Sequence, residues 1–170
     1  MTLNEALERV LKAYERYYTV ERGGAAPPFQ AEAAFHRHDE RYFLSRSIRL
    51  SQSDARETVF FTAVDSLDAA TLTRLDRAAW STGLSRAVPR WGQRESDVAL
   101  VILTDRLEPE AARLIRAANR SRGYAFSLKG WSNYRLIAVE LPTGRTAGNR
   151  LGCRMAGMLR GILGFGRDDT

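Results

Sequence analysis

Cysteine, lysine and histidine are scarce in this chain of 170 residues, and long apolar runs are absent. A single cysteine, Cys153, excludes an internal disulfide and favours a reducing compartment, so we expect a cytoplasmic protein. The longest apolar run, residues 98–103, is far shorter than the roughly 18 residues that a membrane span requires. The first residues lack the basic start and the apolar stretch of a secretion signal, so we expect neither export nor a membrane partner.

The motifs of the common catalytic and cofactor-binding sites are also missing. The chain contains no P-loop, no G-x-S-x-G elbow, no HExxH and no CxxC. We therefore expect no cofactor, and whether the protein is an enzyme stays open.

The composition is that of an ordinary globular protein, with 44% hydrophobic and 27% charged residues. The length suits one domain, which we place at residues 1–164, followed by a disordered tail at 165–170.

The net charge of +6 comes almost entirely from arginine, because Lys12 and Lys129 are the only lysines. One explanation is the amino-acid bias of a GC-rich genome, and the other is a basic surface for an acidic partner. Residues 106–170 hold 12 basic and 5 acidic residues, whereas residues 1–105 are nearly balanced. Genome bias alone does not predict that asymmetry.

Hydrophobic periodicity predicts an α/β (or α+β) domain with a mixed sheet, helices on its faces and the order α-β-β-β-α-β-α-β-β-α. The first helix has a Thr2–Glu5 capping box and an apolar stripe that runs to Tyr18. The link between the strands that contain Val64 and Val98 should be a right-handed crossover, which makes those strands parallel. The expected strands are Phe29–His38, Arg41–Leu50, Thr58–Val64, Val98–Leu103, Tyr124–Leu128 and Arg135–Leu141, and the last helix is Arg150–Leu163.

Two aspartates follow predicted parallel strands, Asp65 and Asp105. Carboxylates at the carboxyl edge of a parallel sheet suit a divalent cation or acid–base chemistry, which makes both candidate catalytic residues. The alternative is that each one caps the following turn.

His36 and His38 would point to the same face of a strand and form a weak candidate metal site, since no third ligand is evident. Ordinary surface histidines at the end of a strand explain the pair equally well.

Basic residues gather in the C-terminal third, on helical faces and in turns close to aromatic residues. Such a surface suits nucleic acid or an acidic protein, and a solvated helix face is the alternative. The candidate binding residues are Arg113, Arg116, Arg120, Lys129, Trp131, Asn149, Arg150 and Arg154.

Two stretches together resemble a family of uncharacterised bacterial proteins. The first stretch runs from Tyr42 to Asp65, and the second from Phe126 through Gly130-Trp131 to Asn149-Arg150. The resemblance implies no known activity, but it directs attention to Gly130, Trp131, Asn149 and Arg150 as a site.

The α-β-β-β-α-β order is similar to the core of restriction-endonuclease-like nucleases. Those enzymes carry Glu-x-Lys on the third strand, whereas here Glu57 is followed at position 59 by valine. The resemblance therefore implies at most a relative that does not cleave nucleic acid.

The function is unknown from the sequence, and the preferred hypothesis is a non-enzymatic binding or regulatory domain with a basic C-terminal surface. One alternative is a metal-dependent hydrolase or phosphoryl-transfer enzyme that uses Asp65 and Asp105. The other is a structural protein that assembles as a homodimer.

Overall fold

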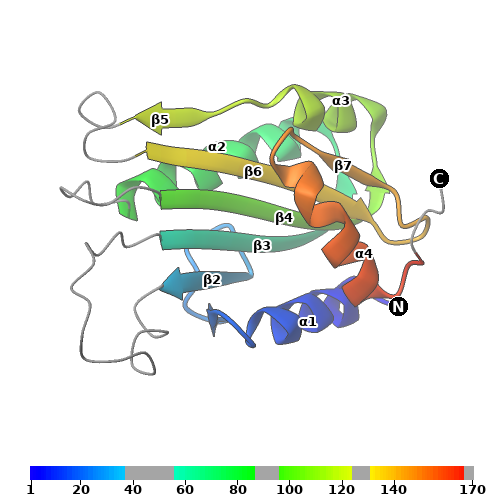
Figure 1. The fold of residues 1–170 in the computed structure, drawn as a ribbon. Helices are drawn as coiled ribbons and strands as arrows, with labels where there is room; N and C mark the ends of the chain where they lie inside the picture. The colour runs from blue at the N-terminus through cyan, green and yellow to red at the C-terminus, as the bar shows by residue number, and fades with distance from the viewer. Residues whose placement is uncertain (37–55, 87–95, 124–130, 167–170) are drawn as a thin grey trace.

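The computed structural model describes residues 1–36, 56–86, 96–123 and 131–166. These residues form an α/β fold in which helices cover both faces of one mixed sheet, as the sequence predicts (Figure 1). In chain order the elements are α1 (Leu3–Tyr14), β1 (Thr19–Glu21), β2 (Ala31–His36), β3 (Arg56–Leu67), α2 (Ala69–Arg86), β4 (Ser96–Leu107), α3 (Pro109–Ala117), β5 (Ser121–Gly123), β6 (Trp131–Glu140), β7 (Thr146–Gly148), the 3₁₀ helix η2 (Gly152–Met155) and α4 (Ala156–Leu163).

The sheet has the strand order β1-β2-β3-β4-β6-β5, and β7 pairs with β6. Strands β3, β4 and β6 are parallel, and β1 and β2 pair antiparallel at one side. The predicted parallel pairing across the first crossover is confirmed, with Thr58 opposite Val98 and Val64 opposite Thr104. Strands β5 and β7 pair with the beginning and the end of β6, respectively.

Alternation along the parallel strands divides the core into two layers. Val59, Val101 and Ile137 face α1 and α4, whereas Phe60 and Leu100 face α2 and α3. Figure 1 shows α1 and α4 on the near face of the sheet. Because β4 is buried on both faces, its sequence is a continuous apolar run rather than an alternating one.

The first helix begins as predicted, because the Thr2 hydroxyl accepts from the Glu5 amide and the Glu5 carboxylate accepts from the Thr2 amide. The helix ends at Tyr14, however, so the expectation that Tyr17 and Tyr18 continue it is wrong. The amides of both residues bond the Tyr14 carbonyl, which turns the chain out of the helix and into β1.

The structure contains short strands that the sequence does not predict. The short strands β1 and β7 have too few residues for an alternating pattern, and β5 precedes the strand expected at Tyr124–Leu128. The strands expected at Arg41–Leu50 and Tyr124–Leu128 lie outside the described residues. None of the helices described is both long and apolar enough to cross a bilayer.

The C-terminal helix starts as a 3₁₀ turn because Asn149 holds its first residues. The Asn149 side chain accepts from the amides of Gly152 (2.7 Å) and Leu136 (3.1 Å) and donates to the Tyr134 carbonyl (3.0 Å). Phe165, which the sequence places in a disordered tail, packs against the core, and its amide bonds the Arg160 carbonyl.

A buried carboxylate joins the ends of β6 and β4. Glu140 accepts from the Leu107 amide (2.8 Å), the Thr143 hydroxyl (2.6 Å) and Arg145 (3.2 Å). Burial acts to raise the pKa of Glu140, but the hydrogen bonds and the Arg145 charge together outweigh burial, and the pKa lies below the usual value.

Replacing Glu140 with Gln should destabilise the fold by about 1–3 kcal/mol at pH 7, because the buried donors lose an ionised acceptor. The folded pKa of Glu140 is lowered, so its contribution is present above the unfolded pKa of about 4.3 and is lost as the pH falls through the folded pKa. Denaturant unfolding of both proteins from pH 7 to pH 2.5 should therefore show the difference shrinking with acid.

The matched control is Glu110→Gln, which removes an exposed helical ion pair with Arg113 and should leave the stability close to that of the parent at every pH. A difference for Glu140→Gln that does not change with pH would contradict the assigned role.

Candidate functional site

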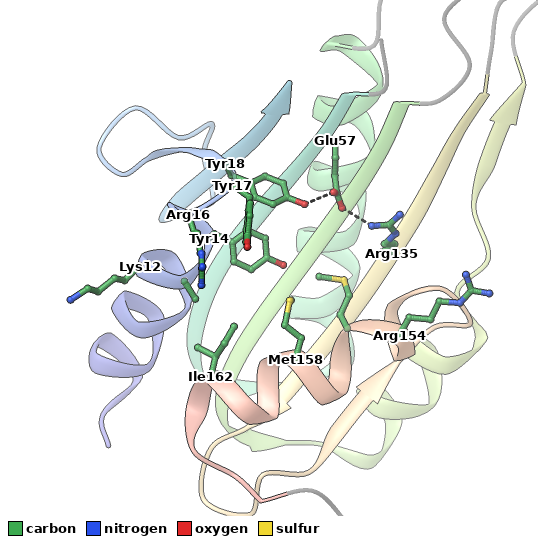
Figure 2. A pocket seen from close by; sticks show the side chains of 12 residues that line it. Lys12, Tyr14, Arg16, Tyr17, Tyr18, Glu57, Arg135, Arg154, Met158 and Ile162 are labelled. Atoms are coloured by element: carbon green, nitrogen blue, oxygen red, sulfur yellow. Dashed lines mark hydrogen bonds and ion pairs between the residues drawn. The ribbon is translucent and has the colours of Figure 1, made fainter. Parts of the chain in front are cut away.

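A groove lies between the end of α1 and the η2–α4 segment, over the amino-terminal half of the parallel strands (Figure 2). Its first part, here called the apolar lobe, has a volume of about 470 Å³. That volume is within the range of small-molecule sites, roughly 300–1,000 Å³. The apolar lobe is lined by Lys12, Ala13, Tyr14, Arg16, Tyr17, Tyr18, Glu57, Arg135, Arg154, Met155, Met158 and Ile162.

A second part, here called the polar lobe, has a volume of about 490 Å³. Its lining consists of Asp97, Asn133, Arg135, Leu151, Arg154 and Met155. Three of these residues, Arg135, Arg154 and Met155, also line the apolar lobe. The two lobes are therefore adjoining halves of one groove.

The polar floor of the groove follows from strand register. Glu57 pairs with Asp97 across β3 and β4, and both residues occupy the sheet face that α1 and α4 cover further along the strands. The next residue of that face in β3 is Val59, which is fully buried. The apolar face of the sheet thus gives way to carboxylates near the start of the strands.

Arg135 bridges the two carboxylates from β6. One terminal nitrogen of its guanidinium lies 2.7 Å from Glu57 Oε1, and the other lies 2.6 Å from Asp97 Oδ2. Tyr18 donates its hydroxyl to Glu57 Oε2 at 2.6 Å, and the Asn133 amide donates to Asp97 Oδ1 at 3.2 Å. All four carboxylate oxygens therefore have partners.

Tyr14 brings a phenolic hydroxyl into the groove. Its side chain is 6% exposed and packs edge-on against Phe61, yet its hydroxyl has no hydrogen-bond partner among the described residues. Figure 2 shows the ring pointing into the space between α4 and the Glu57–Arg135 pair. Burial raises the pKa of Tyr14 well above its ordinary value, and Glu57 adds to the effect, so the hydroxyl stays protonated.

Cations surround the opening. Arg154 borders both lobes and forms no ion pair with any residue that the structure describes. Arg16 lies over the Tyr17 ring, 5.5 Å from its centroid, and Lys12 extends away from the cavity in Figure 2. The residues that line the groove include four cations and two carboxylates.

Exposed apolar side chains also gather here. Tyr17 is 65% exposed and Met158 is 47% exposed. Within the described part of the chain, Met1 is the other large hydrophobic residue exposed to a similar degree. A single exposed apolar residue is ordinary, and here two of them line the same cavity.

The structure distributes the predicted arginines over different parts of the surface. Arg113, Arg116 and Arg120 lie on or just after α3, whose apolar side packs against the opposite layer of the sheet from the groove. Arg113 pairs with Glu110 (2.5 Å) and Arg120 pairs with Asp76 (2.6 Å). Arg116 is exposed.

Among the other predicted residues, Arg154 lines the groove, and Arg150 is exposed in the turn before η2. Asn149 is buried and its side chain is occupied by three backbone groups, so it positions η2 rather than facing solvent. Trp131 begins β6, but its side chain is not described. Lys129 and Gly130 lie outside the described residues.

Asp65 and Asp105 lie on neighbouring parallel strands, between the pairs Val64–Thr104 and Ser66–Arg106. Both are exposed, and neither lines the apolar or the polar lobe. The residue that caps α2 is Asp68, whose carboxylate accepts from the Thr71 amide at 2.7 Å. A catalytic role for the aspartate pair stays a prediction.

The metal candidates gain no support from geometry. His36 ends β2, and His38 lies outside the described residues. Across the described ranges, no group of three or more His, Cys, Asp or Glu residues is placed to hold a metal ion.

Residues 2–160 match the model of the family described as Domain of unknown function (DUF8052). The chain belongs to this family. No curated protein and no solved structure matches the chain significantly. The resemblance to an uncharacterised family is thus confirmed, whereas the bacterial origin and the restriction-endonuclease-like topology stay predictions.

Most groove residues carried no signal in the sequence. Tyr14, Tyr17 and Tyr18 continue a helical stripe and looked like core residues, and Arg135 is one arginine among many. Glu57 was noted for a nuclease motif, but its observed partners are Arg135 and Tyr18. One signal was available: three tyrosines within five positions at the end of an amphipathic helix exceed what a core stripe needs.

Replacing Arg135 with Met should leave Glu57 and Asp97 facing each other without a cation. Both carboxylates are mostly buried, with side chains 15% and 12% exposed, so the fold should lose about 2–4 kcal/mol at pH 7. Urea unfolding measures the loss. Adding Glu57→Gln and Asp97→Asn should restore most of the stability, because no buried charge then lacks a partner.

The control for this series is Arg113→Met, which removes an exposed pair and should change the stability far less than Arg135→Met does. Equal losses for Arg135→Met and Arg113→Met, or no recovery in the triple variant, would contradict the bridging role.

Proposed function

We propose that this domain binds a small molecule with an apolar body and an ionised acidic group, and that the groove between α1 and α4 is the binding site. The observation that carries the proposal is that four features suited to such a ligand lie around the same cavity. Exposed Tyr17 and Met158, the Tyr14 hydroxyl and Arg154 all border one cavity, and the structure describes no hydrogen-bond or ion-pair partner for the last two among the residues it covers.

The apolar part of the ligand follows from the lining of the first lobe. Tyr17, Met158 and Ile162 present side chains that solvent contacts in the free protein. Covering a side chain of this size with an apolar ligand contributes about 1.5–3 kcal/mol. A ligand without an apolar body would leave this surface in water.

The acidic part of the ligand follows from the charges. Both carboxylates of the groove already accept from Arg135, whereas Arg154 has no acidic partner among the described residues. A guanidinium in this state favours a carboxylate, sulfonate or phosphate through paired N–H donors. The Tyr14 hydroxyl adds a neutral donor deeper in the groove.

The proposal is a binding role rather than catalysis. Glu57 and Asp97 have all their oxygens occupied, so neither is free to act as a base. The proposal keeps the hypothesis of a non-enzymatic binding domain, but it places the binding site in the groove instead of on a basic C-terminal surface. Of the predicted arginines, Arg154 is the one that borders the groove.

Anilinonaphthalene sulfonate, which combines an aromatic body with one sulfonate, should bind the native protein and gain fluorescence. Tyr17→Ser and Met158→Gln should each weaken binding about tenfold, because each removes apolar contact area. Both residues are exposed, so these variants should fold as the parent does. Fluorescence titration measures the affinity, and denaturant unfolding verifies the stability.

Arg154→Gln should also weaken binding of the probe, and the effect should diminish at high salt. The matched control is Arg116→Gln, another exposed arginine, which lies on α3 and outside the groove. Unchanged affinity in Tyr17→Ser and Met158→Gln would rule out the groove as the site.

A further inference from the structure

The two lobes differ in chemistry although they adjoin and are of similar size. The apolar lobe is walled by tyrosine, methionine and isoleucine, and the polar lobe has Asp97, Asn133 and Arg135 on its floor. Arg154 and Met155 stand where the lobes meet. A ligand that fills the whole groove therefore has one apolar half and one polar half.

We infer that the ligand is a single-chain amphiphile whose head carries a phosphomonoester, with its chain in the apolar lobe and its phosphate beside Arg154 in the polar lobe. This inference rests on the proposed function and specifies the class of ligand.

The walls of the apolar lobe favour a flexible chain. Met155 and Met158 are unbranched and polarisable, so they adapt to a chain that takes several conformations. Tyr14 and Tyr18 already pack on each other, with ring centroids 5.0 Å apart, and Arg16 lies over Tyr17. These rings are partly occupied by contacts within the protein, which leaves less free ring surface for stacking a planar ligand.

The donors of the polar lobe favour a head with several oxygens. Arg135 uses one N–H from each terminal nitrogen for the carboxylates, so further N–H groups of its guanidinium remain for a ligand. Arg154 has all its donors free of partners among the described residues. A volume of about 490 Å³ is more than a single carboxylate fills, and it suits a phosphate on a polar linker.

The charge of the groove also matches a phosphomonoester. The polar lobe is lined by two cations, Arg135 and Arg154, and one carboxylate, Asp97, and the further cations Lys12 and Arg16 line the adjoining apolar lobe. A phosphomonoester carries about 1.5–2 negative charges at pH 7, whereas a carboxylate carries one. Because Lys12 extends away from the cavity, its charge acts at the rim rather than in contact with the head.

The test compares four ligands below their micellar concentrations by isothermal titration calorimetry. They are lauroyl glycerol phosphate, which has both halves, laurate, uncharged monolauroyl glycerol and glycerol phosphate. The compound with both halves should bind at least tenfold more tightly than any of the other three. The affinity for lauroyl glycerol phosphate should fall between pH 8 and pH 6, because the second pKa of the phosphate is about 6. The affinity for laurate should stay the same over this range.

Two variants separate the lobes. Arg154→Gln should reduce the preference for lauroyl glycerol phosphate over monolauroyl glycerol at least tenfold, whereas Arg116→Gln should leave it unchanged. Met158→Gln should lower the affinity for all three chain-bearing ligands by a similar factor, so that the preference among them does not change.

The outcomes distinguish the inference from the proposed function. Equal affinities for lauroyl glycerol phosphate and monolauroyl glycerol, or an Arg154→Gln variant that keeps the preference, would overturn the phosphate head while groove binding stands. Tighter binding of glycerol phosphate than of any chain-bearing ligand would overturn the inference that the apolar lobe holds an acyl chain. Failure of all four ligands and of anilinonaphthalene sulfonate would overturn both proposals.

Discussion

The bridge from Arg135 to Glu57 and Asp97 is the interaction on which the groove depends. Three parallel strands contribute one residue each, and the guanidinium reaches both carboxylates at 2.6–2.7 Å. Without the bridge, two mostly buried carboxylates would repel each other at the start of β3 and β4. With it, the sheet face can end in polar residues beside an apolar core, and a cavity can stay open there.

The remaining arginines show why net charge alone is a weak guide to the binding surface. The C-terminal third holds the surplus of positive charge, yet several of its arginines serve the fold itself. Arg145 bonds the Leu107 carbonyl and Glu140, and Arg160 bonds the Gly144 carbonyl. Arg113 and Arg120 pair with acids. The asymmetry along the sequence thus includes cations that are neutralised locally.

The sequence predicted the elements whose patterns are long, and it missed those defined by tertiary contacts. The capping box at Thr2 and the central strand through Val98 were predictable, because local hydrogen bonds and burial on both faces leave clear patterns. Strand β7 was not predictable, because three residues are too few to show an alternating pattern and its position depends on pairing with β6. The end of α1 was misplaced because Tyr17 and Tyr18 keep helical spacing after the chain has turned.

The site was less predictable than the fold for a physical reason. Glu57, Asp97 and Arg135 are far apart in the sequence, and the parallel register of β3, β4 and β6 brings them together. Of the predicted site residues, Arg154 reaches the groove, and Asn149 instead fixes the turn from which Arg154 projects.

Several side chains that remain open to a ligand converge on the groove, and this convergence is the strongest argument for function. An exposed tyrosine, an exposed methionine, a hydroxyl that opens onto the groove and an arginine without an acidic partner among the described residues are each tolerable alone. Tyr14 and Tyr17 lie in α1 and the turn after it, Arg154 and Met158 lie in η2 and α4, and the fold brings these two ends of the chain to one cavity. A ligand that covers the apolar side chains, accepts from the hydroxyl and neutralises the cation would satisfy all of them at once.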